Sequence, residues 1–191
     1  MNQFTCSKCD ICLLNNHLPM IGDGNLDANI MFVTRNPNNL EMKNNIPLFD
    51  KAGMLFQDYL NLFNFSRDLI YITNAVKCRT PGNRLPTDKK IYNCQNYLQD
   101  EINEIKPKIV VLLGDTAIRT YFKLAYSILS MHSDELNSKY IVDNNRIILF
   151  MIHPNYALYS NENRIAMFNS FKTLLTLYRI INPGHTVNFV E

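Results

Sequence analysis

The chain has 191 residues, of which 47% are hydrophobic, which is enough to bury one core within the usual size of a single domain. We therefore expect one domain over residues 1–191, and we expect it to be a monomer. A run of about 18 apolar residues is missing, and the polar N-terminus does not resemble a signal peptide, which predicts a cytoplasmic protein. The formal net charge of +2 is too small to identify a polyanionic partner by itself.

Short apolar runs alternate with longer stretches of helix-spaced apolar residues. The runs are continuous and bounded by polar residues, as in strands buried on both faces, and they cover residues 30–33, 69–72, 109–113 and 147–151. The predicted helices cover residues 51–63, 89–105, 115–129 and 161–181. This alternation predicts an α/β fold, a three-layer α/β/α sandwich with a central four-stranded parallel sheet and right-handed crossovers.

Polar side chains follow the predicted strands. Asn36 and Asn74 come after the first two strands, and His153 follows the fourth. In open α/β sheets, ligands bind outside the carboxyl ends of the strands, so these side chains are expected to face a ligand. Any one of them alone is at least as often a turn former or a helix cap.

A basic cluster follows the second predicted strand and includes Lys77, Arg79, Arg84, Lys89 and Lys90. Clustered cations of this kind indicate a nucleic-acid partner better than the small net charge does. A plain solvated loop is the alternative interpretation.

Four cysteines form a set suited to a metal. Cys6 and Cys9 form a CxxC pair, and Cys78 and Cys94 lie further along the chain. In a reducing compartment such a set favours zinc or an iron-sulfur cluster over disulfides. Cys9 and Cys12 form a second CxxC, so the N-terminal pair stays open, and the spacing does not separate zinc from iron.

Several motifs together resemble the uracil-DNA glycosylase superfamily, most closely its iron-sulfur branch, family four. Residues 71–86 are very similar to that branch's YITNxVKCRPPxNRxP run, and residues 153–156 to its HPAY motif. Residues 21–25 resemble GEGN, residues 47–53 resemble PFVGKAG, and residues 107–114 resemble the PxxIVxLG strand. The resemblance covers most of the chain.

The resemblance implies a 4Fe-4S cluster held by Cys6, Cys9, Cys78 and Cys94, with a structural role. Counting to Gly22 favours Cys6 and Cys9 over the pair that includes Cys12.

The resemblance also implies DNA as partner, with a pyrimidine flipped into a pocket. Asn74 would read the base edge, because its amide offers both a donor and an acceptor, and His153 would donate to the base oxygen as negative charge develops. The DNA contacts would come from Arg79, Asn83, Arg84, Asn155 and Tyr156. Tyr156 or Leu158 would fill the gap left by the flipped base.

Two departures from family four bear on the substrate. Arg35 stands where the family has a glutamate that is expected to help hydrolysis, and Leu48 replaces a phenylalanine that stacks on uracil. Asn36 before Pro37 resembles the GINP and GMNP motifs of the mismatch-specific and single-strand-selective branches, in which an asparagine positions the water. Asn36 is therefore the catalytic candidate. Arg35 is expected to pair with a DNA phosphate or to reach a polar group on an enlarged base, with a plain surface arginine as the alternative interpretation, and Leu48 is expected to contact the base.

These departures predict a monofunctional DNA glycosylase that removes a 5-substituted pyrimidine. Hydroxymethyluracil is one candidate base, and glucosylated hydroxymethylcytosine is another if the protein serves anti-phage defence. The runner-up is a uracil-DNA glycosylase of base-excision repair. A non-catalytic DNA-binding relative is a further alternative, favoured by Arg35, and a zinc-stapled binding module ranks last.

Overall fold

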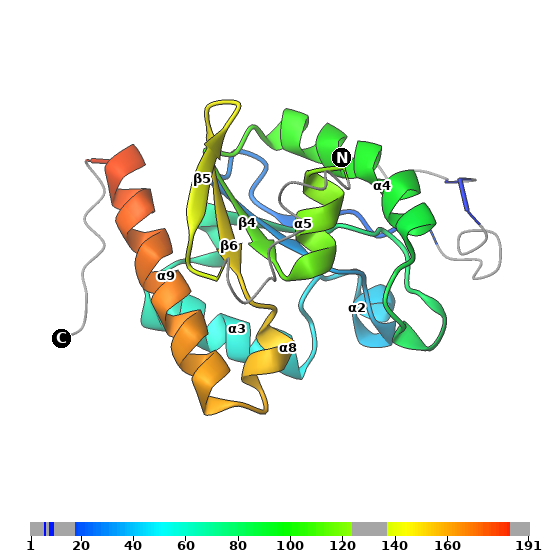
Figure 1. Cartoon of the computed structure of the whole chain (residues 1–191), viewed down its shortest axis with the longest axis horizontal. Helices are drawn as coiled ribbons and strands as arrows, with labels where there is room; N and C mark the ends of the chain where they lie inside the picture. The colour runs from blue at the N-terminus through cyan, green and yellow to red at the C-terminus, as the bar shows by residue number, and fades with distance from the viewer. Residues whose placement is uncertain (1–5, 7, 10–17, 124–136, 184–191) are drawn as a thin grey trace.

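The computed structural model describes residues 6, 8, 9, 18–123 and 137–183. These residues form a six-stranded sheet with helices against both faces, so the protein has an α/β fold (Figure 1). The order across the sheet is β1-β3-β2-β4-β6-β5. The strands are β1 (Asp23–Gly24), β2 (Ile30–Thr34), β3 (Ile70–Asn74), β4 (Ile109–Leu113), β5 (Tyr140–Asp143) and β6 (Arg146–Met151).

The four inner strands, β3, β2, β4 and β6, pair in parallel and confirm the four predicted strands. The outer strands β1 and β5 pair antiparallel with their neighbours, so the sheet is mixed, and the prediction of a purely parallel sheet of four strands was wrong. β1 is only two residues long and β5 is largely exposed, so neither carries a long buried apolar run. Two adjacent asparagines, Asn144 and Asn145, form the turn between β5 and β6, and both adopt positive φ, at 47° and 62°. Asparagine is favoured at such positions in hairpin turns.

Three of the predicted helices match observed helices to within a residue at each end. The helices are α2 (Asn39–Asn44), α3 (Lys51–Leu62), α4 (Asp88–Ile105), α5 (Asp115–Tyr121), α8 (Pro154–Ala157) and α9 (Asn161–Ile181). The fourth prediction corresponds to α5, and its residues 124–129 lie outside the described part of the chain. α2 was not predicted because six residues are too few to show a helical period. Within the described residues, no helix is long and apolar enough to cross a bilayer.

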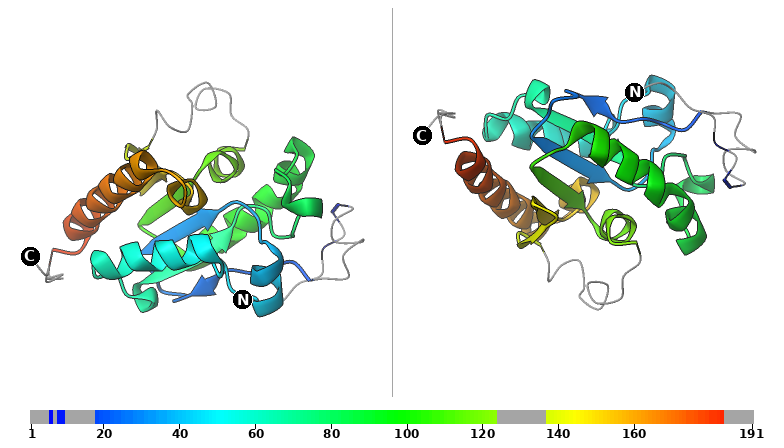
Figure 2. Two further views of the ribbon diagram at one scale, coloured as in Figure 1. Left: turned by 90° about the horizontal axis from the view of Figure 1, so that it is seen from below. Right: turned by 90° about the horizontal axis from the view of Figure 1, so that it is seen from above.

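The sheet separates two hydrophobic layers. α3 and α9 cover one face of the sheet, and α4 and α5 cover the other (Figure 2). Ile30 and Phe32 of β2 pack toward α3 and α9, with the Phe32 ring 4.9 Å from that of Phe56, while Met31 and Val33 pack toward α4 and α5. This alternation follows from the pleat of a strand buried on both faces. The three-layer arrangement of helix, sheet and helix is therefore confirmed.

The register of the inner strands places their carboxyl ends at one edge. Thr34 pairs with Asn74 across β2 and β3, and Leu113 pairs with Met151 across β4 and β6. The polar segments that follow these strands therefore start next to one another. They supply part of the wall of the pocket described below.

Candidate active site

A pocket of about 220 Å³ opens at the carboxyl edge of the sheet. Its lining comes from segments that are far apart in the sequence: the end of β2 with the segment that follows it, α2, the loop before α3, the loop before α4, the end of β4 with the start of α5, and α8 with the residue before it. The lining residues are Thr34, Arg35, Asn36, Asn38, Glu41, Leu48, Asp50, Asn83, Leu85, Leu113, Gly114, Asp115, Thr116, His153, Asn155 and Tyr156.

His153 is held in one tautomer by two hydrogen bonds. The backbone N–H of Asn155 donates to Nδ1 at 3.2 Å, so the neutral ring carries its proton on Nε2, which lies 2.8 Å from Oγ1 of Thr34. Burial and the Arg35 guanidinium lower the pKa of His153 to about 4, and the Asp50 carboxylate acts in the opposite direction. At neutral pH the ring is therefore an uncharged N–H donor.

Gly114 gives the imidazole its space. It has a φ of +78°, which favours glycine, and a Cβ on it would lie 3.4 Å from Cβ of His153. The end of β4 and the segment after β6 can therefore approach closely.

Asn36 is oriented through its amide nitrogen. Its Nδ2 donates to the carbonyl of Pro37 at 3.1 Å and to Oδ1 of Asn83 at 3.2 Å, with Oγ1 of Thr80 at 3.5 Å. The residue is 6% exposed, and its Oδ1 has no hydrogen-bond partner among the described residues. This geometry presents an oxygen acceptor at a buried position in the pocket wall.

Arg35 and Asn36 share a partner. Nη2 of Arg35 donates to Oδ1 of Asn83 at 3.4 Å, so one amide oxygen accepts from both neighbours. Asn83 has a positive φ of 54° at the end of a short 3-10 turn (Pro81–Asn83). Asn83, which belongs to the basic loop, therefore also contacts the catalytic candidate Asn36.

Asn74 is placed differently. Its side chain is fully buried at the end of β3, beside Thr34 of β2, and it does not line the pocket. Both polar atoms of its amide lack hydrogen-bond partners among the described residues. A buried amide without partners is costly, and its two polar atoms can still accept and donate hydrogen bonds to a ligand that reaches them.

Leu48 lines the pocket in a strained backbone conformation, with a φ of 53°. Its N–H donates to Oε1 of Glu41 at 2.6 Å, which holds the loop in place. The loop runs directly over the first turn of α3, where a Cβ on Gly53 would lie 1.7 Å from the carbonyl oxygen of Leu48. Glycine is required at that position by this close approach.

Glu41 and Asp50 are pocket acids that the sequence analysis did not single out. Oε2 of Glu41 accepts from the N–H of Asn38 at 2.6 Å, and burial is the main cause that raises its pKa. Asp50 caps α3, accepting from the N–H of Gly53 at 2.9 Å and from Nδ2 of Asn38 at 2.8 Å. Asp50 could have been singled out from the sequence, because the PFVGKAG motif of family four has a glycine at that position.

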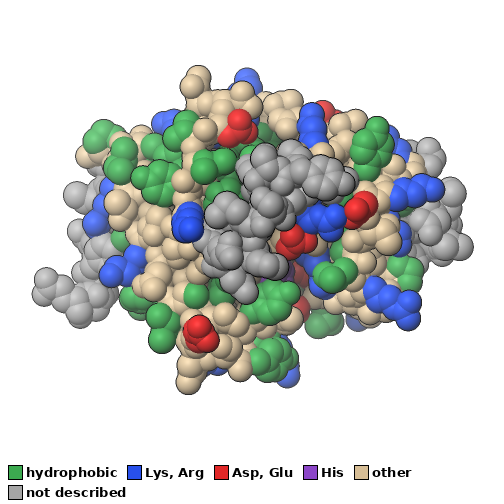
Figure 3. All heavy atoms as spheres, in the orientation of Figure 1, with side chains coloured by type: hydrophobic (Ala, Val, Ile, Leu, Met, Phe, Trp, Pro, Cys, Tyr) green, Lys and Arg blue, Asp and Glu red, His purple; other side chains and the backbone are tan. Residues whose placement is uncertain are grey.

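The predicted DNA contacts come from two segments, the loop between β3 and α4 and helix α8. Asn83 and Arg84 are exposed in the loop, and Asn155 and Tyr156 are exposed in α8, with Tyr156 61% exposed. Arg79, also in the loop, is half-buried. Figure 3 shows Lys and Arg side chains on the right-hand part of one face, over α4 and the loop that leads into it, and others scattered elsewhere.

The cysteine segments meet at α4. Cys78 and Cys94 are buried, and Cys6 and Cys9 are half-buried. The N-terminal segment is attached to α4, because Nδ2 of Asn93 donates to the carbonyl of Lys8 at 2.7 Å and the Lys8 ammonium lies 4.3 Å from the centre of the Tyr97 ring.

Cys6 and Cys9 act electrostatically on Cys94. Burial raises the pKa of Cys94, the backbone and charge of Lys77 oppose this, and Cys9 and Cys6 raise it further. In the described part of the chain, no three Cys, His, Asp or Glu side chains lie close enough to hold one metal ion. Cys12, the alternative ligand, lies outside the described residues.

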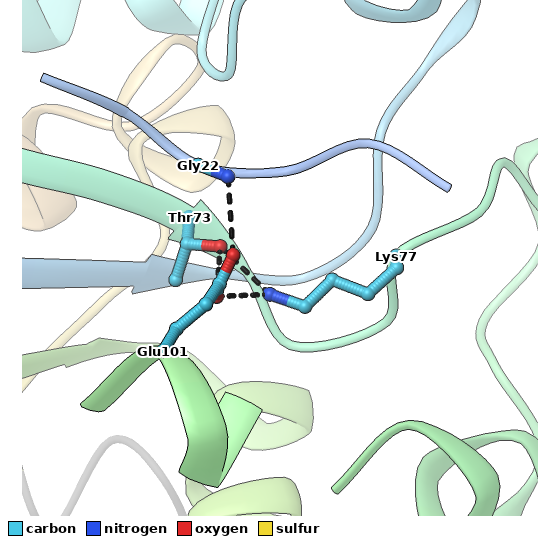
Figure 4. Close-up of polar contacts among 4 residues, drawn as sticks. All are labelled: Gly22, Thr73, Lys77 and Glu101. Atoms are coloured by element: carbon cyan, nitrogen blue, oxygen red, sulfur yellow. Dashed lines mark hydrogen bonds and ion pairs between the residues drawn. The ribbon is translucent and has the colours of Figure 1, made fainter. Parts of the chain in front are cut away.

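A buried ion pair supports the segment between β3 and Cys78 (Figure 4). Nζ of Lys77 contacts Oε2 of Glu101 and donates to Oγ1 of Thr73 at 2.8 Å, and Thr73 donates to the same carboxylate at 2.6 Å. The N–H of Gly22 donates to Oε1 of Glu101 at 3.1 Å. We call these four residues the Lys77 network.

Comparison with known proteins decides the family. The family model of the uracil DNA glycosylase superfamily matches residues 21–176. The chain belongs to this superfamily and is a DNA glycosylase. The family implies DNA as its substrate, and the predicted resemblance is confirmed at this level.

Two curated relatives match the glycosylase over most of its length. A type-4 uracil-DNA glycosylase of Thermotoga maritima is 34% identical over 164 residues, which are 83% of this chain and 82% of the relative. A type-4 uracil-DNA glycosylase of Sulfurisphaera tokodaii is 33% identical over 190 residues, 97% of this chain and 85% of the relative. A DNA polymerase of Bacillus phage SP01 is 28% identical over 177 residues, 92% of this chain and 18% of the polymerase.

The structure of this DNA glycosylase brings most of its predicted site residues together. Arg35, Asn36, Leu48, Asn83, Asn155, Tyr156 and His153 line one pocket. Asn74 lies behind the pocket wall, and Arg79 and Arg84 are outside the lining. Thr34, Glu41 and Asp50 join the site only through tertiary contacts.

Proposed function

We propose that this DNA glycosylase is monofunctional and hydrolyses the bond between deoxyribose and a flipped uracil. The observation that carries the proposal is the pairing, in one pocket, of a neutral His153 N–H donor with the amide oxygen of Asn36, which has no hydrogen-bond partner in the described part of the chain. Uracil is the first choice because the two relatives described above that match over most of both chains are named type-4 uracil-DNA glycosylases.

The proposed chemistry assigns a separate role to each side chain. Extrusion of the nucleotide costs a few kcal/mol, which contacts with the base must recover. Nε2–H of His153 leaves Thr34 for the base oxygen, where it stabilises the negative charge of the leaving base. Oδ1 of Asn36 accepts a hydrogen bond from water and holds it in line with the sugar carbon, and Asn83 keeps the amide from flipping.

Asn74 supplies base discrimination in this proposal. Its two unpaired amide atoms match the donor and acceptor of a pyrimidine edge, and their present cost would be recovered when a base binds. Because Asn74 lies behind the pocket wall, the base must reach deeper than the pocket now extends, or the wall must move.

A 5-substituted pyrimidine remains the second candidate substrate. Leu48 in place of phenylalanine removes a stacking surface, and Arg35 offers a cation beside the pocket that could meet a polar substituent. Removal of hydroxymethyluracil, or of glucosylated hydroxymethylcytosine in anti-phage defence, stays a prediction.

A role in DNA binding without catalysis is favoured by a different observation. The relative from phage SP01 is a DNA polymerase, and this chain matches 18% of it. Such a protein could act beside replication, and Arg35 in place of the family glutamate is consistent with lost hydrolysis.

The first experiment measures base release by mass spectrometry. The panel contains DNA with uracil, hydroxymethyluracil, hydroxymethylcytosine and glucosylated hydroxymethylcytosine. Release of uracil supports the proposal, and release of one modified base alone would replace it with the second candidate. DNA binding with no release from any substrate would favour the non-catalytic role.

The Asn36→Ala variant tests the catalytic assignment. It should abolish base release and leave DNA binding nearly intact, because it removes the acceptor for water. Asn39→Ala is the matched control, since Asn39 is exposed at the start of α2. Turnover unchanged by Asn36→Ala would move the chemistry elsewhere.

Cys6, Cys9, Cys78 and Cys94 would hold a 4Fe-4S cluster. Cys6 and Cys9 act electrostatically on Cys94 of α4, and four thiols suit this group chemically, because a cluster binds each cysteine to a different iron, whereas one zinc ion needs all four at a single centre. When bound, the cluster would tie the N-terminal segment to α4 and the segment after β3.

Visible absorption and iron content of anaerobically purified protein test the cluster. A colourless protein with stoichiometric zinc would refute it. Cys6→Ala should lose more iron than Cys12→Ala, and the reverse order would change the ligand assignment.

A further inference from the structure

The charged side chains of the pocket stand at different positions from those of family four. Arg35 occupies the position of the family's glutamate, and Asp50 occupies that of a glycine in the PFVGKAG motif. Both side chains line the same pocket as Asn36 and His153. The pocket therefore has a carboxylate in a different segment from the one that carries the glutamate in family four.

Asp50 is held in a fixed orientation. Its Oδ1 accepts from the N–H of Gly53 at 2.9 Å, and its Oδ2 accepts from Nδ2 of Asn38 at 2.8 Å. A carboxylate has about four acceptor sites, so each oxygen keeps capacity for a further partner. Two hydrogen bonds from different segments thus position a carboxylate that can still accept from water.

The other acids of the pocket are less suited to this task. Glu41 is 4% exposed, and its two oxygens accept from the backbone N–H groups of Leu48 and Asn38, so it holds the loop. Asp115 is 64% exposed and lies 3.9 Å from Arg119, on the solvent side. Asp50 is half-buried and acts electrostatically on His153.

We propose that Asp50 is the catalytic carboxylate of this pocket and takes over the role that the glutamate at position 35 has in family four. The water oxygen bonds to the sugar carbon C1′, and the C1′–N bond breaks with its electron pair leaving on the base. One proton of the water passes to Asp50 and then to solvent, and the base anion is protonated from solvent. Before that transfer, the carboxylate also stabilises the positive charge on the sugar.

This inference rests on the proposed hydrolysis of a pyrimidine nucleotide. The test is the single-turnover rate of base release by the full-length protein and by Asp50→Asn, on the panel substrate that the wild type processes fastest. Asparagine keeps the helix cap and removes the charge. We expect a loss of about 100-fold or more, the usual scale of acid–base catalysis, with DNA affinity unchanged.

Two further variants separate charge from helix capping. Asp50→Ser retains a good cap and should lose as much rate as Asp50→Asn. Ser66→Ala removes the cap of a 3-10 turn (Arg67–Leu69) at the opposite edge of the sheet and should keep the wild-type rate. A loss below tenfold in both Asp50 variants overturns the inference and leaves the proposed function standing. If the wild type releases no base from any substrate of the panel, the proposed function itself is contradicted.

An exchange of residues gives a gain-of-function test. Asp50→Gly should be slow, and adding Arg35→Glu in the same chain returns a carboxylate to the family's position. We expect the double variant to be at least tenfold faster than Asp50→Gly. A double variant no faster than Asp50→Gly, together with a loss below tenfold in Asp50→Asn, would overturn the assignment.

Discussion

Two groups of polar side chains flank the ends of the same strands, and they are built in opposite ways. In the Lys77 network, the ammonium of Lys77 and both oxygens of Glu101 have partners, although the two side chains are almost fully buried. Around the pocket, the oxygen of Asn36 and both amide atoms of Asn74 lack partners among the described residues. Buried polar groups with hydrogen-bond partners stabilise a fold, whereas buried polar groups without partners cost free energy unless a ligand binds them.

The largest effect should come from breaking the satisfied group. Lys77→Met leaves the Glu101 carboxylate buried without its counter-charge, so the free energy of unfolding should fall by about 3 to 5 kcal/mol in urea titrations. The double variant Lys77→Met with Glu101→Gln should recover part of this loss. A loss below about 1 kcal/mol for the single variant would contradict a buried pair.

On the pocket side, His153→Ala should change catalysis far more than stability. Removal of an electrostatic donor should slow the chemical step by roughly 2 to 4 kcal/mol in single-turnover assays. Tyr159→Ala, at a residue 82% exposed beyond α8, is the control and should keep the wild-type rate. Equal rates in the two variants would remove His153 from the mechanism.

The same histidine makes stability depend on pH. Its pKa is about 4 in the folded protein against an ordinary value of 6.5, so the unfolded chain binds the proton more readily. Stability from this group is complete above pH 6.5 and is lost as the pH falls toward 4, by at most about 3 kcal/mol. Urea titrations at pH 7 and 4.5 should show a steeper loss in the wild type than in His153→Gln. Equal losses of stability in the two proteins would mean that a group other than His153 causes the pH dependence.

The smallest effect should have the opposite sign. Asn74→Leu replaces an unpaired buried amide by an apolar side chain of similar shape, so it should raise the free energy of unfolding by about 1 to 2 kcal/mol. Base release should be lost in the same variant. A fall in stability would show that the Asn74 amide is satisfied in the folded protein, and the contrast with the Lys77 network would fail.

The inner strands and three of the helices could be predicted because their signals are local. Residues 109–113 and 161–181 match β4 and α9 in both bounds, since a continuous apolar run or a helical period reflects burial directly. The edge strands carried weaker signals, as two residues or an exposed apolar triplet show little of this pattern.

Motifs also indicated several of the residues that line the pocket, but not the contacts among them. Asn36 and His153 could be proposed from strand ends and from the resemblance to family four. Nothing in the sequence indicated that Asn83 would accept hydrogen bonds from Arg35 and Asn36, because 46 residues separate Asn83 from Asn36 along the chain.

The sequence alone determined the α/β class, the parallel inner strands and the family, because periodicity and motifs are properties of short segments. Only the tertiary structure decided that Asp50 shares a pocket with Asn36 and His153, that His153 is neutral, and that the buried amide of Asn74 has no partner among the described residues. These properties depend on burial and on contacts between distant segments. They arise when the strands align their carboxyl ends and the loops close over them.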